Sequence, residues 1–396
     1  MANLNTSTPP TSKRIESMEI DRYRTIDGLR GIAATAVIVQ HCVEFSPLNS
    51  PGAATASPIG YLFANDINLG RFGVILFFFI SGFLIPSSIG RQPKPLVSFV
   101  IGRFFRLYPL YWFSIILALA VMIVLGNKLP SVAMVLANTT MFQMLFGFEN
   151  ILYPYWTLLV EHAFYLGCMF LFVVGALHSA AAMRVVATAS AIAIILLSSV
   201  LIAEPAMRYA KPAADLMYVA SFLFAMIVGH NVRMAQESDP GRIITPVSVM
   251  FIVVFAFIYV ARVRVGGFST LLSPASVFIS TVAALFVFLL ALRWRAFTAT
   301  VFVYSGRISY GLYLFHGIAL WVAMALIGKP SDGVHSILLF LLVFGLAFAV
   351  SAVTFNLIEE PFIALGKTIR RRVVRNVGSQ AASETLSLPP LSKELS

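Results

Sequence analysis

Arg30 and His41 lie eleven residues apart within one apolar segment, Leu29–Phe45. Ionisable side chains are costly inside a membrane-spanning helix, which makes both residues functional candidates. Eleven residues at about 100° each make roughly three full turns, so the two side chains share one helical face. At about 1.5 Å per residue they lie ~16 Å apart along the helix axis. The spacing predicts a cation at one membrane surface and an imidazole near the middle of the bilayer.

Three further polar residues interrupt apolar segments elsewhere in the chain: Ser81, Glu161 and His316. Counting about 1.5 Å per residue from the expected helix ends places them in the middle or outer half of a bilayer about 30 Å thick. We therefore expect them to converge with His41 in one cavity. Each also has a structural alternative, because intramembrane serine and histidine often mediate helix packing, and Glu161 can simply pair with a cation.

Arg103 and Arg106 have the i,i+3 spacing that puts two guanidinium groups on one helical face. Paired arginines suit bidentate phosphate binding, although arginines also anchor cytoplasmic helix ends in general. The chain has no Walker loop, GxGxxG, HExxH or GxSxG motif, so any chemistry is expected in or beside the membrane. Its two cysteines, Cys42 and Cys168, lie in apolar runs; we expect buried free thiols and no metal site.

The composition identifies the elements that position these residues. Of 396 residues, 59% are hydrophobic and 11% charged, whereas soluble domains carry about 25% charged residues. We expect an all-α, polytopic transmembrane helical bundle, with a short re-entrant or interfacial helix at 132–146. The apolar runs predict ten spans of about 20 residues: 29–46, 70–89, 107–126, 155–176, 183–203, 214–232, 244–262, 273–292, 304–327 and 336–358.

Basic residues predict the orientation of the bundle. With ten spans both termini share a side, and 21 of the 28 Lys and Arg residues fall on that side. The positive-inside rule then places both termini in the cytoplasm. The same asymmetry accounts for the net charge of +11, so nucleic acid is not an expected partner. We expect a cytoplasmic tail at 1–24 without a signal peptide, a membrane domain at 25–366, and a basic, then disordered cytoplasmic tail at 367–396.

Six motifs follow one another along nearly the whole chain. They are RTIDGLRGIAA (24–34) leading to His41, GVILFFFISGFLI (73–85), RFFRLYP (103–109), YWTLLVEHAFY (155–165), ISYGLYLFH (308–316) and EEPF (359–362). Each motif alone is degenerate, but six in order with sensible spacing are specific. Together they resemble the acyltransferase 3 family of integral membrane acyltransferases over roughly residues 22–366. Thr157 stands where the family commonly has Ser, and His162 where it commonly has Glu or another polar residue.

The resemblance implies an O-acyltransferase of the bacterial inner membrane. Such enzymes move an acyl group, most often acetyl, from cytoplasmic acyl-CoA to a hydroxyl of a surface polysaccharide, a lipid-linked sugar or a macrolide-type polyketide. The family's Arg-x10-His pair corresponds to Arg30 and His41, its Arg-x-x-Arg pair to Arg103 and Arg106, and its acidic residue to Glu161. Some relatives carry a fused hydrolase-like domain; this chain is expected to act alone or with a separate partner protein.

The expected mechanism follows the two charged motifs. Arg103 and Arg106 hold the phosphates of acetyl-CoA, and the ~20 Å arm of the donor passes Arg30 toward His41, ~16 Å further along the helix. His41 acts as general base on the acceptor hydroxyl, or forms a covalent acyl-histidine.

Supporting residues are expected around His41. Either Glu161 or Glu44 orients the imidazole, as the third member of a triad does. His316, Ser81 or Tyr310 stabilises the developing oxyanion. An alternative function is a transporter or flippase that uses Arg30, His41 and Glu161 as a proton relay.

Overall fold

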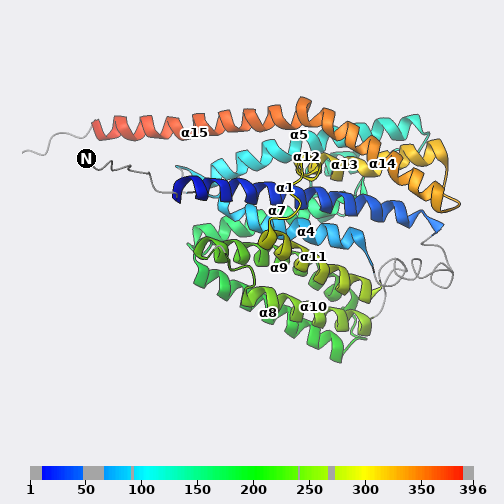
Figure 1. Cartoon of the computed structure of the whole chain (residues 1–396), viewed down its shortest axis with the longest axis horizontal. Helices are drawn as coiled ribbons and strands as arrows, with labels where there is room; N and C mark the ends of the chain where they lie inside the picture. Colours follow the sequence, from blue (N-terminus) through cyan, green and yellow to red (C-terminus); the bar gives the residue numbers. More distant parts are fainter. Residues whose placement is uncertain (1–10, 48–66, 91–92, 240, 266–272, 387–396) are drawn as a thin grey trace, which may run out of the picture.

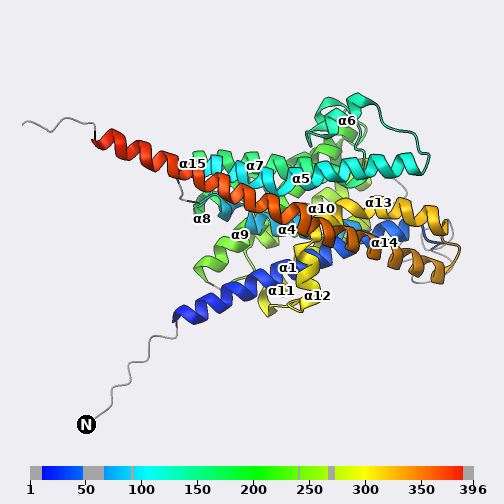
Figure 2. The ribbon, with the colours of Figure 1, turned by 90° about the horizontal axis from the view of Figure 1, so that it is seen from above.

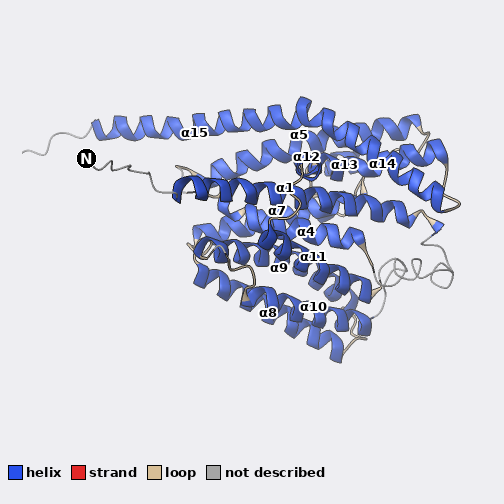
Figure 3. Cartoon of the chain, viewed as in Figure 1, coloured by secondary structure: helices blue, strands red, loops and turns tan. Residues whose placement is uncertain are grey.

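The computed structural model describes residues 11–47, 67–90, 93–239, 241–265 and 273–386, and all regular elements in these ranges are helical (Figure 3). Ten of the described helical segments are long and apolar enough to cross a membrane, which confirms the polytopic helical bundle. The long helices are α1 (Thr11–Glu44), α4 (Leu69–Leu84), α5 (Pro95–Val124), α7 (Trp156–Val173), α8 (Ala180–Ala203), α9 (Ala210–Ser238), α10 (Pro246–Val265), α11 (Pro274–Trp294), α13 (Ser309–Ile327), α14 (Gly333–Thr354) and α15 (Glu360–Leu386).

Helices α1 and α4 lie between two groups of helices. One group contains α5, α13, α14 and α15, and the other contains α8 to α11 (Figure 1). Helix α1 packs directly on α4, on α13 and on the short helix α12 (Thr300–Arg307). The start of α1 and the end of α15 project from the same end of the bundle in both views (Figures 1 and 2).

Glycines permit the closest helix contacts around α1 and α4. A Cβ on Gly306 of α12 would overlap the carbonyl oxygen of Asp27 in α1. A Cβ on Gly82 of α4 would likewise overlap the carbonyl oxygen of Met226 in α9. Small residues at helix crossings let backbones approach closely in a membrane, so Gly82 is a packing residue, whereas its neighbour Ser81 lines a cavity.

The polar segment 132–146 forms the short helix α6 (Val132–Asn138) and a 3-10 turn, and it is not among the membrane-length segments. Three aromatic side chains of α5 hold it in place. The hydroxyls of Tyr108 and Tyr111 and the indole N–H of Trp112 donate hydrogen bonds to the carbonyls of the three consecutive residues 138–140, at 2.6 to 3.0 Å. These bonds satisfy carbonyls left free at the helix end.

Two expected segments begin or end elsewhere. Helix α5 starts at Pro95, twelve residues before the expected start at residue 107, because a proline in the first turn can begin a helix ahead of the most apolar stretch. The expected continuous span 304–327 is divided into α12 and α13 at Ile308, whose φ of −90° and ψ of 8° depart from helical geometry. The tight contact of Gly306 with α1 fixes the orientation of α12 on one side of this break.

Both expected tails contain helix. Helix α1 already begins at Thr11, and α15 continues to Leu386, through the basic part of the tail expected at 367–396. The first turns of α15 pack on α5, with Gly366 against the ring of Phe105. After Pro361 in the first turn of α15, the sequence has no proline to interrupt the helix until Pro389, which is consistent with its extension past the packed part.

Candidate active site

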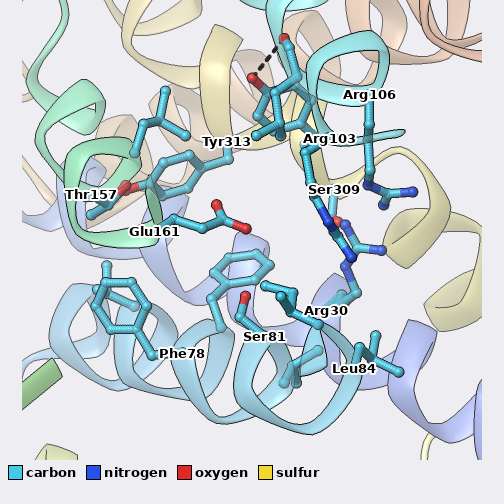
Figure 4. Close-up of a pocket in the computed structure, with 17 residues that line it drawn as sticks. Arg30, Phe78, Ser81, Leu84, Arg103, Arg106, Thr157, Glu161, Ser309 and Tyr313 are labelled. Carbon is cyan, nitrogen blue, oxygen red and sulfur yellow. Dashed lines mark hydrogen bonds between the residues drawn. The ribbon is translucent and has the colours of Figure 1, made fainter. Parts of the chain in front are cut away.

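A cavity of about 250 Å³ lies among α1, α4, α5, α7 and α13, and we call it the arginine cavity. Glu161 points into it from one side, and Arg30, Arg103 and Arg106 line the other side (Figure 4). Ser81, Thr157, Ser309, Tyr310 and Tyr313 complete its polar lining. The cavity thus combines three cations with one carboxylate and several hydroxyl groups.

Arg103 is held by contacts on both sides. Its Nη2 donates a hydrogen bond of 2.9 Å to Oγ of Ser88. Its guanidinium carbon lies 5.3 Å from the ring centre of Phe99 and 5.4 Å from that of Tyr165, within the range of cation–π contacts. The Tyr165 hydroxyl in turn donates a 2.6 Å hydrogen bond to Oε1 of Glu161. These contacts orient Arg103 and Glu161 before any ligand binds.

Arg30 lies well inside helix α1. The membrane-length part of α1 runs from Arg22 to Glu44, so Arg30 lies eight residues from its start and His41 three from its end. This segment begins seven residues before the expected apolar segment, which starts at Leu29.

The charge of Arg30 is compensated by acidic residues nearby. Arg30 interacts electrostatically with Asp27, Glu161 and Glu359, and also with the like charge of Arg106. Carboxylates close to an arginine reduce the cost of placing its charge inside a membrane protein. These interactions account for a cation at this depth in the bundle.

A second cavity of about 430 Å³ contains His41, and we call it the histidine cavity. Nδ1 of His41 lies 2.8 Å from Oε2 of Glu44. An ionised carboxylate only accepts hydrogen bonds, so Nδ1 carries a proton, and in the neutral imidazole Nε2 is then the acceptor. This histidine–carboxylate arrangement is the one that orients a general base in hydrolases and transferases.

Two more rings contact the His41 imidazole. His316 stacks on it with ring centres 5.2 Å apart and planes 19° from parallel, and Tyr153 meets it edge-on at 5.6 Å. Nδ1 of His316 lies 2.7 Å from the backbone carbonyl of Tyr313 and must donate to it, which leaves Nε2 as an acceptor. In this state His316 can accept a hydrogen bond from a ligand hydroxyl but cannot donate one to an oxyanion.

The two cavities meet at Val74 and Tyr313, which line both. The Tyr313 hydroxyl lies 2.9 Å from Oγ1 of Thr157, and Thr157 itself donates a 2.9 Å hydrogen bond to the carbonyl of Pro154. The Tyr313 hydroxyl also lies 3.3 Å from the same carbonyl, so either hydroxyl can be the donor in the bond between Tyr313 and Thr157. The ring of Phe77 packs edge-on against Tyr313 at 5.8 Å. These contacts form a wall between the cavities.

The expected convergence of all polar residues on His41 is wrong. His316 and Glu44 share the histidine cavity with His41, whereas Ser81, Glu161 and Tyr310 line the arginine cavity. The side chain of Tyr313 fills the space between the two groups. Of the two carboxylates considered as partners of His41, Glu44 makes the contact.

Tyr310 also has a partner away from His41. Its hydroxyl donates a 3.0 Å hydrogen bond to the carbonyl of Leu107 in α5. Cys42 and Cys168 are buried and free, as expected.

Sequence reasoning missed three residues of the histidine cavity or its wall: Arg71, Tyr153 and Tyr313. Arg71 is only 8% exposed, and its guanidinium carbon lies 5.0 Å from the ring centre of Phe222. Tyr153 contacts His41 from a different part of the chain, and no local sequence pattern indicates this contact. Tyr313 lies three residues before His316 and four after Ser309, a spacing that places all three on one helical face.

Comparisons with known proteins agree with this architecture. A family model described as an acyltransferase domain, that of the acyltransferase 3 family, matches residues 23–356. The chain is 31% identical over 106 residues to "Protein 2 in picA locus" of Rhizobium radiobacter, an alignment that spans 26% of this chain and 44% of that protein. No solved structure matches the chain. Because the family model covers more than half of the sequence, the chain belongs to the acyltransferase 3 family, and its ten membrane-length segments make it a multi-pass membrane protein.

Proposed function

We propose that this protein is an O-acyltransferase that moves an acyl group, acetyl in the simplest case, from a coenzyme A thioester to a hydroxyl of a carbohydrate-type acceptor. The observation that carries the proposal is the pairing of two adjoining cavities. One is lined by three arginines and the other contains a histidine held by a carboxylate, and Tyr313 lies between them.

The donor's phosphates bind to Arg103 and Arg106 in this proposal. Arginine pairs bind phosphate oxygens through several charge-assisted hydrogen bonds, and Arg103 is already oriented by Ser88. From there the arm of the donor extends through the arginine cavity past Arg30. The ~16 Å rise between Arg30 and His41 is within reach of the ~20 Å arm of coenzyme A.

His41 supplies the base for the transfer. Its Nε2 takes the proton of the acceptor hydroxyl as the acceptor oxygen attacks the thioester carbonyl carbon. The carbon–sulfur bond then breaks, and the proton passes from the imidazolium to the departing thiolate, which leaves as free coenzyme A. Glu44 keeps the imidazole in the required tautomer and stabilises its charged form.

The lining of the histidine cavity supports a sugar-like acceptor. It combines the aromatic side chains of Tyr153, Trp156 and Trp321 with the amides of Gln40 and Asn68. Binding sites with mostly apolar walls and a few convergent polar groups hold one orientation of a small ligand. A sugar ring offers both an apolar face and hydroxyls to such a wall. The membrane we propose is the bacterial inner membrane, with the donor on the cytoplasmic side.

Replacement of His41 tests the proposal. We expect His41→Ala to abolish acetyl transfer to surface polysaccharide or lipid-linked sugar, measured by mass spectrometry of cells with matched amounts of protein in the membrane. His335→Ala is the control, because His335 lines neither cavity. Full transfer by His41→Ala would contradict the proposed base.

Consumption of the donor separates this function from transport. A transporter or flippase needs no acyl-CoA. We expect the purified protein to bind acetyl-CoA and to lose this binding in the double variant Arg103→Ala/Arg106→Ala. A wild-type protein that moves an acylated sugar without binding acetyl-CoA would overturn the proposed reaction.

A further inference from the structure

A third hollow, of about 170 Å³, adjoins the arginine cavity at Arg103 and Arg106, which line both. It lies between α5 and the first turns of α15, two helices that run side by side in both views of the ribbon (Figures 1 and 2). We call it the basic hollow. Its polar lining consists of Ser88, Ser98, Arg103, Arg106, Lys367 and Arg370.

Four cations and no carboxylate are among the described residues that line the basic hollow. Lys367 and Arg370 have the i,i+3 spacing that directs both side chains to one face of α15. On α5, Gly102 leaves room for this contact, since Nη1 of Arg370 lies 3.6 Å from the position that a Cβ of Gly102 would occupy. Four like charges in one hollow repel one another and favour binding of an anion there.

Ser98 independently indicates a ligand in the basic hollow. Its side chain is only 6% exposed and lines the hollow, yet its Oγ has no hydrogen-bond partner among the residues that the structure describes. A buried hydroxyl without a partner is costly and is rare in folded proteins. An anion with several acceptor oxygens would satisfy this hydroxyl and the surrounding cations together.

We propose that the basic hollow binds the 3′-phosphate of the coenzyme A donor, with Lys367, Arg370 and Ser98 as its ligands. This inference rests on the proposed function. The order of these sites matches the order of the groups in coenzyme A. The thioester arm lies in the arginine cavity, the pyrophosphate lies at Arg103 and Arg106, and the ribose 3′-phosphate lies in the basic hollow. Lys367 and Arg370 of α15 then belong to the donor site, in addition to any effect of their charge on the orientation of the helix.

Binding of two nucleotides by the full-length protein tests this inference. We would measure the Kd for coenzyme A and for 3′-dephospho-coenzyme A by calorimetry in phosphatidylcholine nanodiscs. Wild-type protein is expected to bind the dephosphorylated form about tenfold more weakly, which corresponds to the loss of ~1.4 kcal/mol. Lys367→Ala/Arg370→Ala is expected to bind coenzyme A about tenfold more weakly and to lose the discrimination.

Arg371→Ala/Arg372→Ala is the matched control. It removes the same charge from exposed neighbouring positions of α15 that do not line the hollow, and it should keep the discrimination. Equal affinity of the wild type for both nucleotides would overturn the inference and leave the proposed function standing. Absence of any binding by the wild type would overturn the proposed donor as well.

A lipid headgroup is the other source of such a phosphate. If the basic hollow bound the headgroup of phosphatidylglycerol, this lipid would raise the thermal stability of the wild type but not of Lys367→Ala/Arg370→Ala. Neither protein would then distinguish coenzyme A from 3′-dephospho-coenzyme A. That combination would also overturn the inference.

Discussion

The hydroxyls of Tyr313 and Thr157 are joined by a 2.9 Å hydrogen bond, and this pair lies in the wall between the arginine cavity and the histidine cavity. Thr157 is anchored in turn by the carbonyl of Pro154. In the proposed reaction a thioester reaches His41 only when this wall opens. The Tyr313–Thr157 pair therefore controls both the passage of the acyl group and the access of water to it.

Truncation of Tyr313 should uncouple the donor from the acceptor. We expect Tyr313→Ala to join the two cavities and to raise the hydrolysis of acetyl-CoA without acceptor severalfold, measured by release of free thiol. Tyr313→Phe keeps the ring in the wall, so hydrolysis should stay near the wild-type rate while stability falls by about 1 kcal/mol through the lost hydrogen bond. Unchanged hydrolysis in Tyr313→Ala would show that the wall does not restrain the donor.

The two carboxylates near the cavities should differ in their effect on turnover. Glu44→Gln replaces an acceptor on Nδ1 of His41 with an amide that can donate to it, which favours the wrong tautomer. We expect kcat to fall by a factor on the order of 10²–10⁴. Glu161 contacts Tyr165 instead, so Glu161→Gln should lower kcat much less. The reverse ranking in a steady-state assay would assign the orienting role to Glu161.

The crossing of α1 and α12 should tolerate no side chain at Gly306. In Gly306→Ala the new Cβ would overlap the backbone carbonyl of Asp27, which cannot move without shifting α1. We expect the free energy of unfolding to fall by about 1–3 kcal/mol. Size-exclusion chromatography after heating would show this as a lower temperature of aggregation. Gly345→Ala in α14, where nothing lies within 4 Å of the new Cβ, is the control and should not be destabilised.

The distribution of basic residues predicts which loops face outward. A cysteine at Lys128 should react with a membrane-impermeant thiol reagent in intact spheroplasts, and one at Arg242 only after permeabilisation. The background should be low, because Cys42 and Cys168 are buried. Labelling of Arg242→Cys from outside would invert the orientation that we propose.

Local features of the sequence determined the class of the fold and those parts of the site that lie within a single helix. A membrane helix satisfies its backbone hydrogen bonds within its own segment, so a run of apolar residues is sufficient to identify it. Spacing along one helix is equally local: it places Arg103 with Arg106 on one face, and His41 within reach of Glu44 three residues later. The family motifs were likewise readable in order along the chain.

Contacts between helices far apart in sequence decided the rest. The separation of Glu161 from His41 depends on Tyr313, and the meeting of Arg106 with Lys367 and Arg370 depends on how α15 packs on α5. The length of α1 was also not determined by its apolar residues alone, because the helix extends beyond its apolar stretch. Helix rotation, tilt and depth follow from side-chain packing with neighbouring helices. The sequence thus determined which residues could react, and the tertiary packing decided which of them share a cavity.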